Sequence, residues 1–401
     1  MKVYLFTYAY PYGTTEAFLA YELEVLSRLK GLKITIIPRV ISGNKRMIPK
    51  NVEVDSSYAD YVLQNHEKKV LPLFRNLKYL LKGLFSVPKV SMSAFQDVAA
   101  FIHYGQNMVR WVRRTQLEPG ICYTYWCDVE AYGLSLIKEN GELSNPMVSR
   151  AHGFDVYDER RSHGFIPFRK QVLNRLDRLF CVSEDGKKYL TAKYRVKNIE
   201  LSRLGVKQPE VLNPSAETED ITIVSCSMLV KVKRMNLIKD SILAVADLNQ
   251  TRNFTWVHFG GSKEEFSRIL PNHLSGNLRV KHKGQVDNEE IHHFYASEHV
   301  DMLINLSSSE GVPVSMMEAI SYGIPVVATD VGGVSEIINS DNGKLLSPNP
   351  EPSEVANAII YIKGNSRLRS GARDVFARYF DGATNYSNFA RQLSKLNQLD
   401  G

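Results

Sequence analysis

The sequence predicts an α/β protein built from two doubly wound parallel sheets, and three observations lead to that prediction. The chain has 401 residues, whereas one hydrophobic core stops growing near ~250–300 residues. Short apolar runs alternate with segments of helical period, as expected where crossover helices join parallel strands. The periodicity is lost over residues 205–216, where Pro, Asn and Ser accumulate. We therefore expect two domains, residues 1–205 and 206–379, that face each other across a cleft.

Apolar runs rich in β-branched and aromatic residues mark the strands, and each half of the chain has enough of them for its own Rossmann-like sheet. Ligands of such sheets bind beyond the carboxyl ends of the strands, so the loops at that edge should carry the function. The predicted strands are Lys2–Tyr8, Lys33–Pro38, Ile121–Trp126, Met147–Ala151, Arg178–Val182, Ile221–Ser227, Phe254–Phe259, Leu278–His282, Asp301–Leu306, Pro325–Ala328 and Lys344–Leu346.

The charge is divided unevenly along the chain. Residues 1–205 hold 31 Lys and Arg against 20 Asp and Glu, whereas the remainder holds 19 against 23. Residues 68–95 contain six basic residues, no acid and apolar residues at helical spacing, which predicts a basic amphipathic helix. Such a helix binds an anionic membrane surface, or it packs on a core with its basic face in water. No nucleic-acid motif is present, and we expect no nucleic-acid partner.

The N-terminus and the cysteines bear on the compartment. Tyr8, Tyr10 and Pro11 interrupt the first apolar run, and no small-residue cleavage site follows it, so we expect no signal peptide. No stretch reaches the ~18 apolar residues that span a bilayer. The four cysteines have neither metal-ligand spacing nor an extracellular disulfide pattern. These features predict a reducing, cytoplasmic location.

The segment 307–338 carries the clearest candidate chemistry. A predicted strand leads into Glu310, and a predicted helix then carries Glu318, with seven residues between the two carboxylates. Free amides and the helix dipole make such a helix start an anion site. The pattern suits a nucleotide sugar, with its phosphates on the amides and its hydroxyls on the carboxylates. The alternative is an acid that complements the helix dipole and a second acid on the surface.

This segment resembles the signature of glycosyltransferase family 4, whose members are retaining enzymes with the GT-B fold of two Rossmann-like domains. The Glu-x7-Glu pair lies within EGVPVSMMEAISYGIPVVATDVGG, and the other motifs follow the family's order: YPYGTTEAF, RAHGFDVYDER, RLDRLFCVSEDGKKYL, ITIVSCSMLVKVKR, HFGG and KGQVDNEEIHHFYA. The tail NYSNFARQLSKL is similar to the family's last helix. The resemblance implies that residues of about 380–401 return to the acceptor-binding first domain and that 206–379 bind the donor.

The resemblance also implies roles for residues of the second domain. Glu310 would lie near the donor sugar as a catalytic group, Glu318 would hold the ribose, and the backbone of Val286 would contact the base. Lys233 matches the family's diphosphate lysine, whose charge offsets that of the departing nucleotide. The backbone after Glu310 would meet sugar hydroxyls or phosphates, over Gly311, Val312, Pro313 and Val314.

The sequence departs from the family at one phosphate-binding position. Met228 stands where the family has an arginine, and Ser227 stands where it has a glycine. Lys231 or Arg234 would then substitute, or donor binding would depend more heavily on Lys233. Taken without the resemblance, these three basic residues form an ordinary solvated cluster.

The first domain offers four further candidates. Gly13 matches the glycine that lets a loop approach the donor phosphates, although an ordinary turn also explains it. His152 matches a catalytic position and Asp155 an acceptor-binding position, while a hydrogen-bonded structural histidine is the alternative. Glu16 would act on the acceptor, or it would be an acid in the first turn of a helix.

These observations predict a retaining glycosyltransferase that moves a sugar from a nucleotide-sugar donor to a glycan or lipid-linked glycan, as in cell-surface polysaccharide or O-antigen biosynthesis. A nucleotide-sugar epimerase of GT-B fold is the alternative, and a non-catalytic sugar-binding protein is a weaker one. No metal or other cofactor is expected, because the chain has no Asp-x-Asp pair. The basic helix of residues 68–95 would place the enzyme on the inner face of the plasma membrane.

Overall fold

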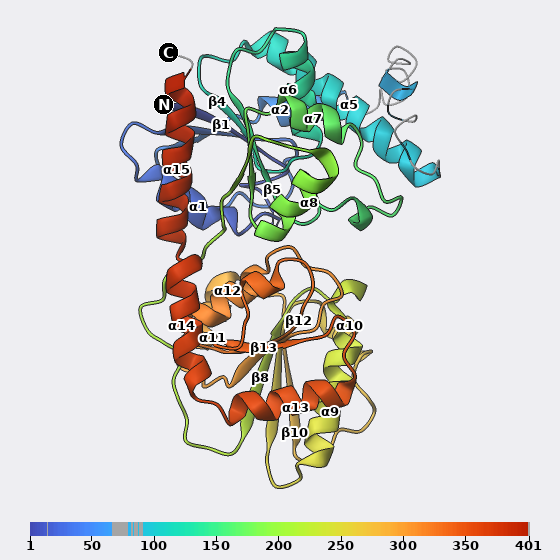
Figure 1. The fold of residues 1–401 in the computed structure, drawn as a ribbon, viewed down its shortest axis with the longest axis vertical. Coiled ribbons are helices and arrows are strands. Elements are labelled where there is room, and N and C mark those ends of the chain that lie inside the picture. Colours follow the sequence, from blue (N-terminus) through green and yellow to red (C-terminus); the bar gives the residue numbers. More distant parts are fainter. Residues whose placement is uncertain (14, 66–78, 82, 84–86, 88–90, 400–401) are drawn as a thin grey trace. The chain divides into compact units, whose positions relative to one another are not determined.

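The computed structural model describes residues 1–13, 15–65, 79–81, 83, 87 and 91–399. The chain divides into two compact units (Figure 1). Unit 1 comprises Met1–Arg203 and Thr384–Gly401, and unit 2 comprises Leu204–Ala383. The basic helix predicted over residues 68–95 falls largely outside the described residues and stays a prediction. Among the helices that the structure does describe, each is too short or too polar to cross a bilayer.

Unit 1 contains a parallel sheet of seven strands in the order β3-β2-β1-β4-β5-β6-β7. Its strands are β1 (Lys2–Thr7), β2 (Lys33–Pro38), β3 (Val52–Val54), β4 (Ile121–Thr124), β5 (Met147–Ala151), β6 (Arg178–Cys181) and β7 (Ile199–Leu201). Its described α-helices are α1 (Leu19–Ser27), α2 (Ser57–Gln64), α5 (Met92–Thr115), α6 (Val129–Glu139), α7 (Arg169–Arg175), α8 (Glu184–Tyr194) and α15 (Gly382–Leu399).

Unit 2 contains a parallel sheet of six strands in the order β10-β9-β8-β11-β12-β13. Its strands are β8 (Ile221–Cys226), β9 (Phe254–Phe259), β10 (Leu278–Gly284), β11 (Met302–Asn305), β12 (Val326–Thr329) and β13 (Gly343–Leu346). Its α-helices are α9 (Met235–Leu248), α10 (Lys263–Ser267), α11 (Asn288–Ser297), α12 (Val314–Ser321), α13 (Pro352–Lys363) and α14 (Arg367–Tyr379).

The two sheets share one topology, which confirms the prediction of two Rossmann-like domains. In each sheet the strand order reverses beside the first strand, so that β1 lies next to β4 and β8 lies next to β11. Ligands of open parallel sheets bind outside the carboxyl ends of the strands at such a switch point. The loops after β1 and β4, and those after β8 and β11, are therefore the first places to look for a site.

The last helix, α15, packs on the sheet of unit 1 and covers a buried ion pair. Phe389 and Leu393 of this helix are fully buried in the same apolar cluster as the strands. The guanidinium of Arg150, on β5, lies 4.2 Å from the ring centroid of Phe389 and forms a fully buried ion pair with Glu22 of α1. The hydroxyl of Tyr123 donates to the same carboxylate over 3.2 Å. Loss of either charged partner would leave an unpaired charge in the core.

Candidate active site

Lys233 and Glu310 meet at the switch point of unit 2. Lys233 ends a 3₁₀ turn after β8 (Lys231–Lys233), and Glu310 lies in the loop after β11. The Lys233 Nζ atom donates to Glu310 Oε1 over 2.5 Å, and both side chains keep some exposure, 23% for the lysine and 11% for the glutamate. The amide of Ser308 donates to the carbonyl of Val232 over 2.9 Å, which joins the two loops. The structure thus brings two predicted donor-site residues together.

Two residues that the sequence analysis did not single out hold Glu310 in place. The Asn305 side chain, at the end of β11, lies 3.4 Å from Glu310 Oε1 and also accepts the amide and hydroxyl of Ser307. Gly332 has φ +56°, and a Cβ there would lie 2.0 Å from the carbonyl oxygen of Glu310. The sequence does contain a signal for each residue: Asn305 is a polar residue at the end of an apolar run, and Gly332 belongs to the paired glycines of VGG.

The structure separates the candidates for the missing phosphate-binding cation. The Arg234 guanidinium donates to the carbonyls of Leu306, Ser307 and Pro348, with the last two at 2.9 and 2.8 Å. The N–H groups of Arg234 are therefore used to connect the loops after β11 and β13. The Lys231 side chain is exposed, as is that of Met228. This arrangement favours Lys231 or Lys233 over Arg234 as the cation available to a phosphate.

Glu318 is buried on α12, so the alternative of a surface acid is wrong. Its side chain accepts a hydrogen bond of 3.0 Å from Asn288, and the His292 ring lies 3.8 Å away. Burial raises the pKa of Glu318 to about 7, although the Asn288 hydrogen bond opposes this shift. α12 itself begins at Val314, directly after Gly311, Val312 and Pro313, so its first amides lie near Glu310.

The loops after β8, β9 and β10 converge beside this region. Gly260, after β9, has φ +113°, and a Cβ there would lie 2.1 Å from the carbonyl oxygen of Ser227. Its amide donates to the carbonyl of Gly284 over 2.7 Å. Val286 follows, two residues before Asn288, which binds Glu318. The contact of Val286 with a base stays a prediction.

In unit 1, His152 follows β5 and lies among aromatic rings. Its ring centroid is 4.8 Å from that of Tyr125 and 4.5 Å from that of Trp126. The side chain is buried, and neither ring nitrogen has a hydrogen-bond partner among the described residues. The nearest carboxylate oxygen, of Asp155, is 4.0 Å from Nδ1, which is too long for a hydrogen bond. The Asp155 carboxylate nevertheless interacts with the imidazole, so both a catalytic role and a structural role of His152 stay predictions.

Asp155 joins the loops after β4 and β5. Its carboxylate accepts the amides of His152 and Cys127, each over 2.7 Å, and the side chain is fully buried. Burial alone would raise the pKa of Asp155, but the nearby His152 and Arg169 and the Cys127 amide lower it below its ordinary value. These contacts give Asp155 a structural task, and its acceptor role stays a prediction.

The loop between β1 and α1 contains Gly13 and Glu16. Gly13 has φ +67°, and a Cβ there would lie 2.9 Å from the carbonyl oxygen of Ser42, so packing already requires glycine. Glu16 has φ +56° and is buried, with its carboxylate bound to backbone amides and to the Trp126 indole. It precedes α1, which begins at Leu19, so the alternative of a first-turn acid is wrong.

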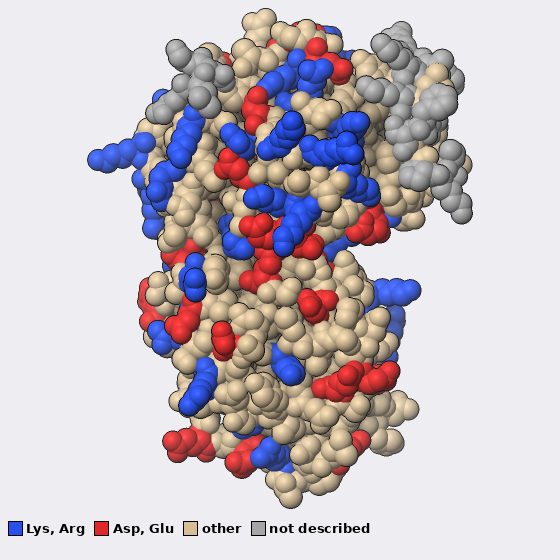
Figure 2. Space-filling view, viewed as in Figure 1, with Lys and Arg blue, Asp and Glu red and all other residues tan. Residues whose placement is uncertain are grey.

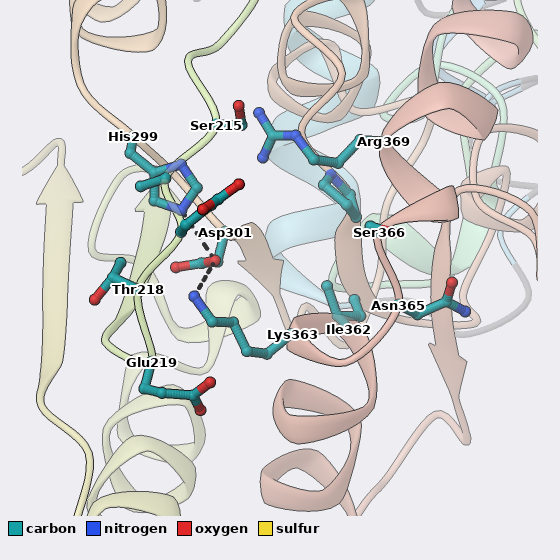
Figure 3. Close-up of a pocket in the computed structure, with 13 residues that line it drawn as sticks. Ser215, Thr218, Glu219, His299, Asp301, Ile362, Lys363, Asn365, Ser366 and Arg369 are labelled. Carbon is teal, nitrogen blue, oxygen red and sulfur yellow. Dashed lines mark hydrogen bonds and ion pairs between the residues drawn. The ribbon is translucent and has the colours of Figure 1, made fainter.

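A separate pocket, lined mainly by polar residues, lies at the amino ends of β11 and β12 in unit 2. Its volume is about 480 Å³ (Figure 3). Asp301, which directly precedes β11, accepts from Lys363 over 2.9 Å and lies 3.1 Å from His299 Nε2. The other nitrogen of His299 lies 2.7 Å from the carbonyl of Pro214. The hydrogen bond with Asp301 raises the pKa of His299. Since these groups satisfy one another, we regard the network as structural.

Comparison with known proteins shows which families the chain resembles in sequence. Residues 208–374 match the family model described as glycosyl transferases group 1. The amylovoran biosynthesis glycosyltransferase AmsK of Erwinia amylovora is 22% identical over 254 residues, which cover 60% of this chain and 59% of AmsK. The putative teichuronic acid biosynthesis glycosyltransferase TuaC of Bacillus subtilis is 22% identical over 365 residues, or 87% of this chain and 86% of TuaC. The chain therefore matches less than two thirds of the length of AmsK, but most of the length of TuaC.

Solved structures extend the likeness to nearly the whole chain. The apo lipopolysaccharide outer core galactosyltransferase WaaB has a TM-score of 0.68 at 14% identity and covers 98% of this chain and 99% of its own. TarM has a TM-score of 0.70 at 12% identity and covers 98% of both chains. The chain has the GT-B fold. This GT-B chain resembles glycosyltransferases in both its sequence and its fold.

Proposed function

We propose that the protein is a retaining glycosyltransferase that moves a sugar from a nucleotide sugar to a glycan or lipid-linked glycan of a cell-surface polysaccharide. One observation carries the proposal: the Lys233–Glu310 pair lies at the switch point of a sheet within the segment that matches glycosyl transferases group 1. The names of relatives that act in amylovoran, teichuronic acid and O-antigen biosynthesis support the acceptor class.

The proposed chemistry begins with cleavage of the donor's anomeric bond, which leaves positive charge on the sugar and negative charge on the departing diphosphate. The Lys233 ammonium and the first amides of α12 would stabilise the diphosphate. Glu310 would orient Lys233 and contact the sugar, and no metal is expected. For retention, the bond to the diphosphate would break and the acceptor oxygen would bond to the anomeric carbon on the same face of the sugar, while the acceptor's hydroxyl proton would pass to the departing phosphate.

Glu318 would bind the ribose of the donor. An ionised carboxylate accepts hydrogen bonds from both ribose hydroxyls, whereas a protonated one loses part of that capacity. Because the pKa of Glu318 is raised to about 7, both forms are populated near neutral pH. Donor affinity should therefore rise with pH across this range.

We propose a cytoplasmic enzyme that binds the inner face of the membrane through residues 68–95. Many Lys and Arg side chains also lie on the face of unit 1 that carries α7 and α8 (Figure 2). The protein should sediment with anionic vesicles at low salt and be released at high salt, because such binding is screened. Equal partition onto neutral and anionic vesicles would contradict membrane binding.

The first test of the function is a thermal-shift panel of UDP-, GDP-, ADP- and dTDP-sugars, since a ligand of the native state raises apparent stability. UDP is a good starting point, because TarM and the O-GlcNAc transferase GtfA were solved in complex with it. Incubation of the stabilising donor with extracts of polysaccharide acceptors then tests transfer. Conversion of the donor alone into another nucleotide sugar would identify an epimerase instead.

Variants of the ion pair test the site. Lys233→Ala should reduce kcat/KM for the donor by at least about a hundredfold, which corresponds to the ~2.7 kcal/mol or more that one such electrostatic contact supplies. Lys233→Arg, which keeps the charge, is the matched control and should retain more activity. Glu310→Gln should lower kcat while leaving the melting temperature nearly unchanged. Unchanged kinetics in Lys233→Ala and Glu310→Gln would refute the site assignment.

A further inference from the structure

The carboxylate of Glu16 is saturated by donors from the protein itself. Its Oε1 atom accepts the amide of Tyr8 over 3.0 Å and the indole N–H of Trp126 over 2.7 Å. Its Oε2 atom accepts the amides of Ala9 and Tyr10 over 2.9 and 2.8 Å. An ionised carboxylate has about four acceptor positions. These four bonds therefore leave little capacity for a hydroxyl of an acceptor.

Glu16 is also held in a backbone conformation that needs external support. Its φ of +56° lies in the left-handed region, which a residue other than glycine adopts only when its surroundings compensate. The side chain is 5% exposed. Burial, backbone conformation and hydrogen bonding thus all fix one position of this carboxylate, directly after β1.

The bond to Trp126 links this carboxylate to the candidate catalytic ring. Trp126 follows β4, which lies beside β1 at the switch point of unit 1. Its ring lies against that of His152, with 4.5 Å between centroids, and Phe18 lies 6.3 Å from Trp126. The imidazole of the buried His152 lies against this indole, and its Nδ1 atom lies 4.0 Å from the Asp155 carboxylate, so packing against the indole is one of the interactions that orient the ring.

We propose that Glu16 is a positioning residue that fixes the β1–α1 loop and the indole of Trp126, and through Trp126 fixes the imidazole of His152. This proposal rests on the proposed function and replaces a direct contact between Glu16 and the acceptor. A positioning residue changes the rate of the chemical step, whereas a residue that binds the acceptor changes the concentration of acceptor required.

Three variants test the proposal. Glu16→Gln keeps the shape of the side chain but replaces one acceptor oxygen with an NH₂ group that opposes the surrounding N–H donors. Trp126→Phe keeps an aromatic ring and removes the indole donor. Each should lower kcat at least about tenfold while the KM for the acceptor stays within about twofold. The double variant should be scarcely worse than either single variant, because both break the same link. Glu24→Gln, an exposed acid on α1, is the control and should retain wild-type kinetics.

A spectroscopic measurement tests the link without activity. The chain has three tryptophans, so Trp→Phe variants assign three indole N–H signals in a ¹⁵N–¹H spectrum. Glu16→Gln should move the Trp126 signal and leave those of Trp111 and Trp256 in place. An unmoved Trp126 signal, or a raised acceptor KM with unchanged kcat, would overturn the proposal. If the wild type transfers no sugar, the proposed function fails while the indole shift still decides the Glu16–Trp126 link.

Discussion

Glu318 should make the stability of unit 2 depend on pH. Its carboxyl is buried on α12, and burial raises its pKa from 4.5 to about 7. The folded state then binds the proton more tightly than the unfolded chain does. The stabilisation from this proton is fully present below pH 4.5 and is lost as pH rises through 7. Glu318→Gln removes the titration while keeping a group that can accept the hydrogen bond from Asn288.

The magnitude follows from the two pKa values of Glu318. The full difference corresponds to about 3 kcal/mol, since each pKa unit is worth 1.36 kcal/mol. Between pH 6 and pH 8 the linkage relation gives a loss of about 1 kcal/mol from this group alone. Glu130 in unit 1 also has a pKa raised to about 7 by burial and acts with the same sign. The wild-type protein must therefore be compared with Glu318→Gln at each pH.

Urea unfolding at pH 6 and pH 8 measures the effect. Trp256 is the single tryptophan between residues 204 and 383, so its fluorescence reports on unit 2 once Trp111 and Trp126 are replaced by Phe. With that background in both proteins, the wild type should lose about 1 kcal/mol relative to Glu318→Gln as pH rises from 6 to 8. Equal pH dependence of the two proteins, or a relative gain by the wild type, would refute the assignment of a raised pKa to Glu318.

Two further predictions concern stability. Gly332→Ala should destabilise unit 2 by about 1–3 kcal/mol, because the positive φ of Gly332 and the 2.0 Å approach of its Cβ position to a carbonyl oxygen both exclude a Cβ. The control Gly276→Ala, at a position in open space, should change stability by less than about 0.5 kcal/mol. Equal urea midpoints for the two variants would contradict this prediction. Arg150→Met should lower the free energy of unfolding by about 3–5 kcal/mol, since it leaves Glu22 buried and unpaired. The double variant with Glu22→Leu should recover part of that loss, and thermal unfolding measures both. A double variant no more stable than the single one would show that the pair itself is required.

The strands could be predicted from the sequence because buried parallel strands are continuous apolar runs. All eleven predicted strands are present, with ends that differ by at most two residues. The two that were missed, β3 (Val52–Val54) and β7 (Ile199–Leu201), have three residues each and lie at the edges of the unit 1 sheet. A segment of that length has no period to detect, and its neighbours in the sheet determine its conformation.

The roles of single polar residues were harder to predict, because their partners are distant in sequence. The bond between Glu16 and Trp126 spans 110 positions, and that between Lys233 and Glu310 spans 77. The family resemblance supplied the second pair, but nothing in the local sequence around Glu16 indicates four donors. The burial of Glu318 was equally hidden, since its spacing from Glu310 does not reveal how much of α12 is covered.

Hydrogen-bond capacity separates the carboxylates that build the loops from those that remain able to bind a ligand. Glu16 accepts four bonds, so a ligand could bind its carboxylate only by displacing protein donors. Asp155 accepts two backbone amides and is fully buried, so its carboxylate joins two loops within the protein. Glu310 is instead held by one lysine and a weak amide contact, although its side chain is only 11% exposed. A phosphate approaching Lys233 can share that ammonium, which has three donors, without leaving an unsatisfied group. Within unit 2, Lys233 and Glu310 are therefore the residues that we expect to change partners if a donor binds, while the saturated carboxylate of Glu16 keeps its loop in unit 1 fixed.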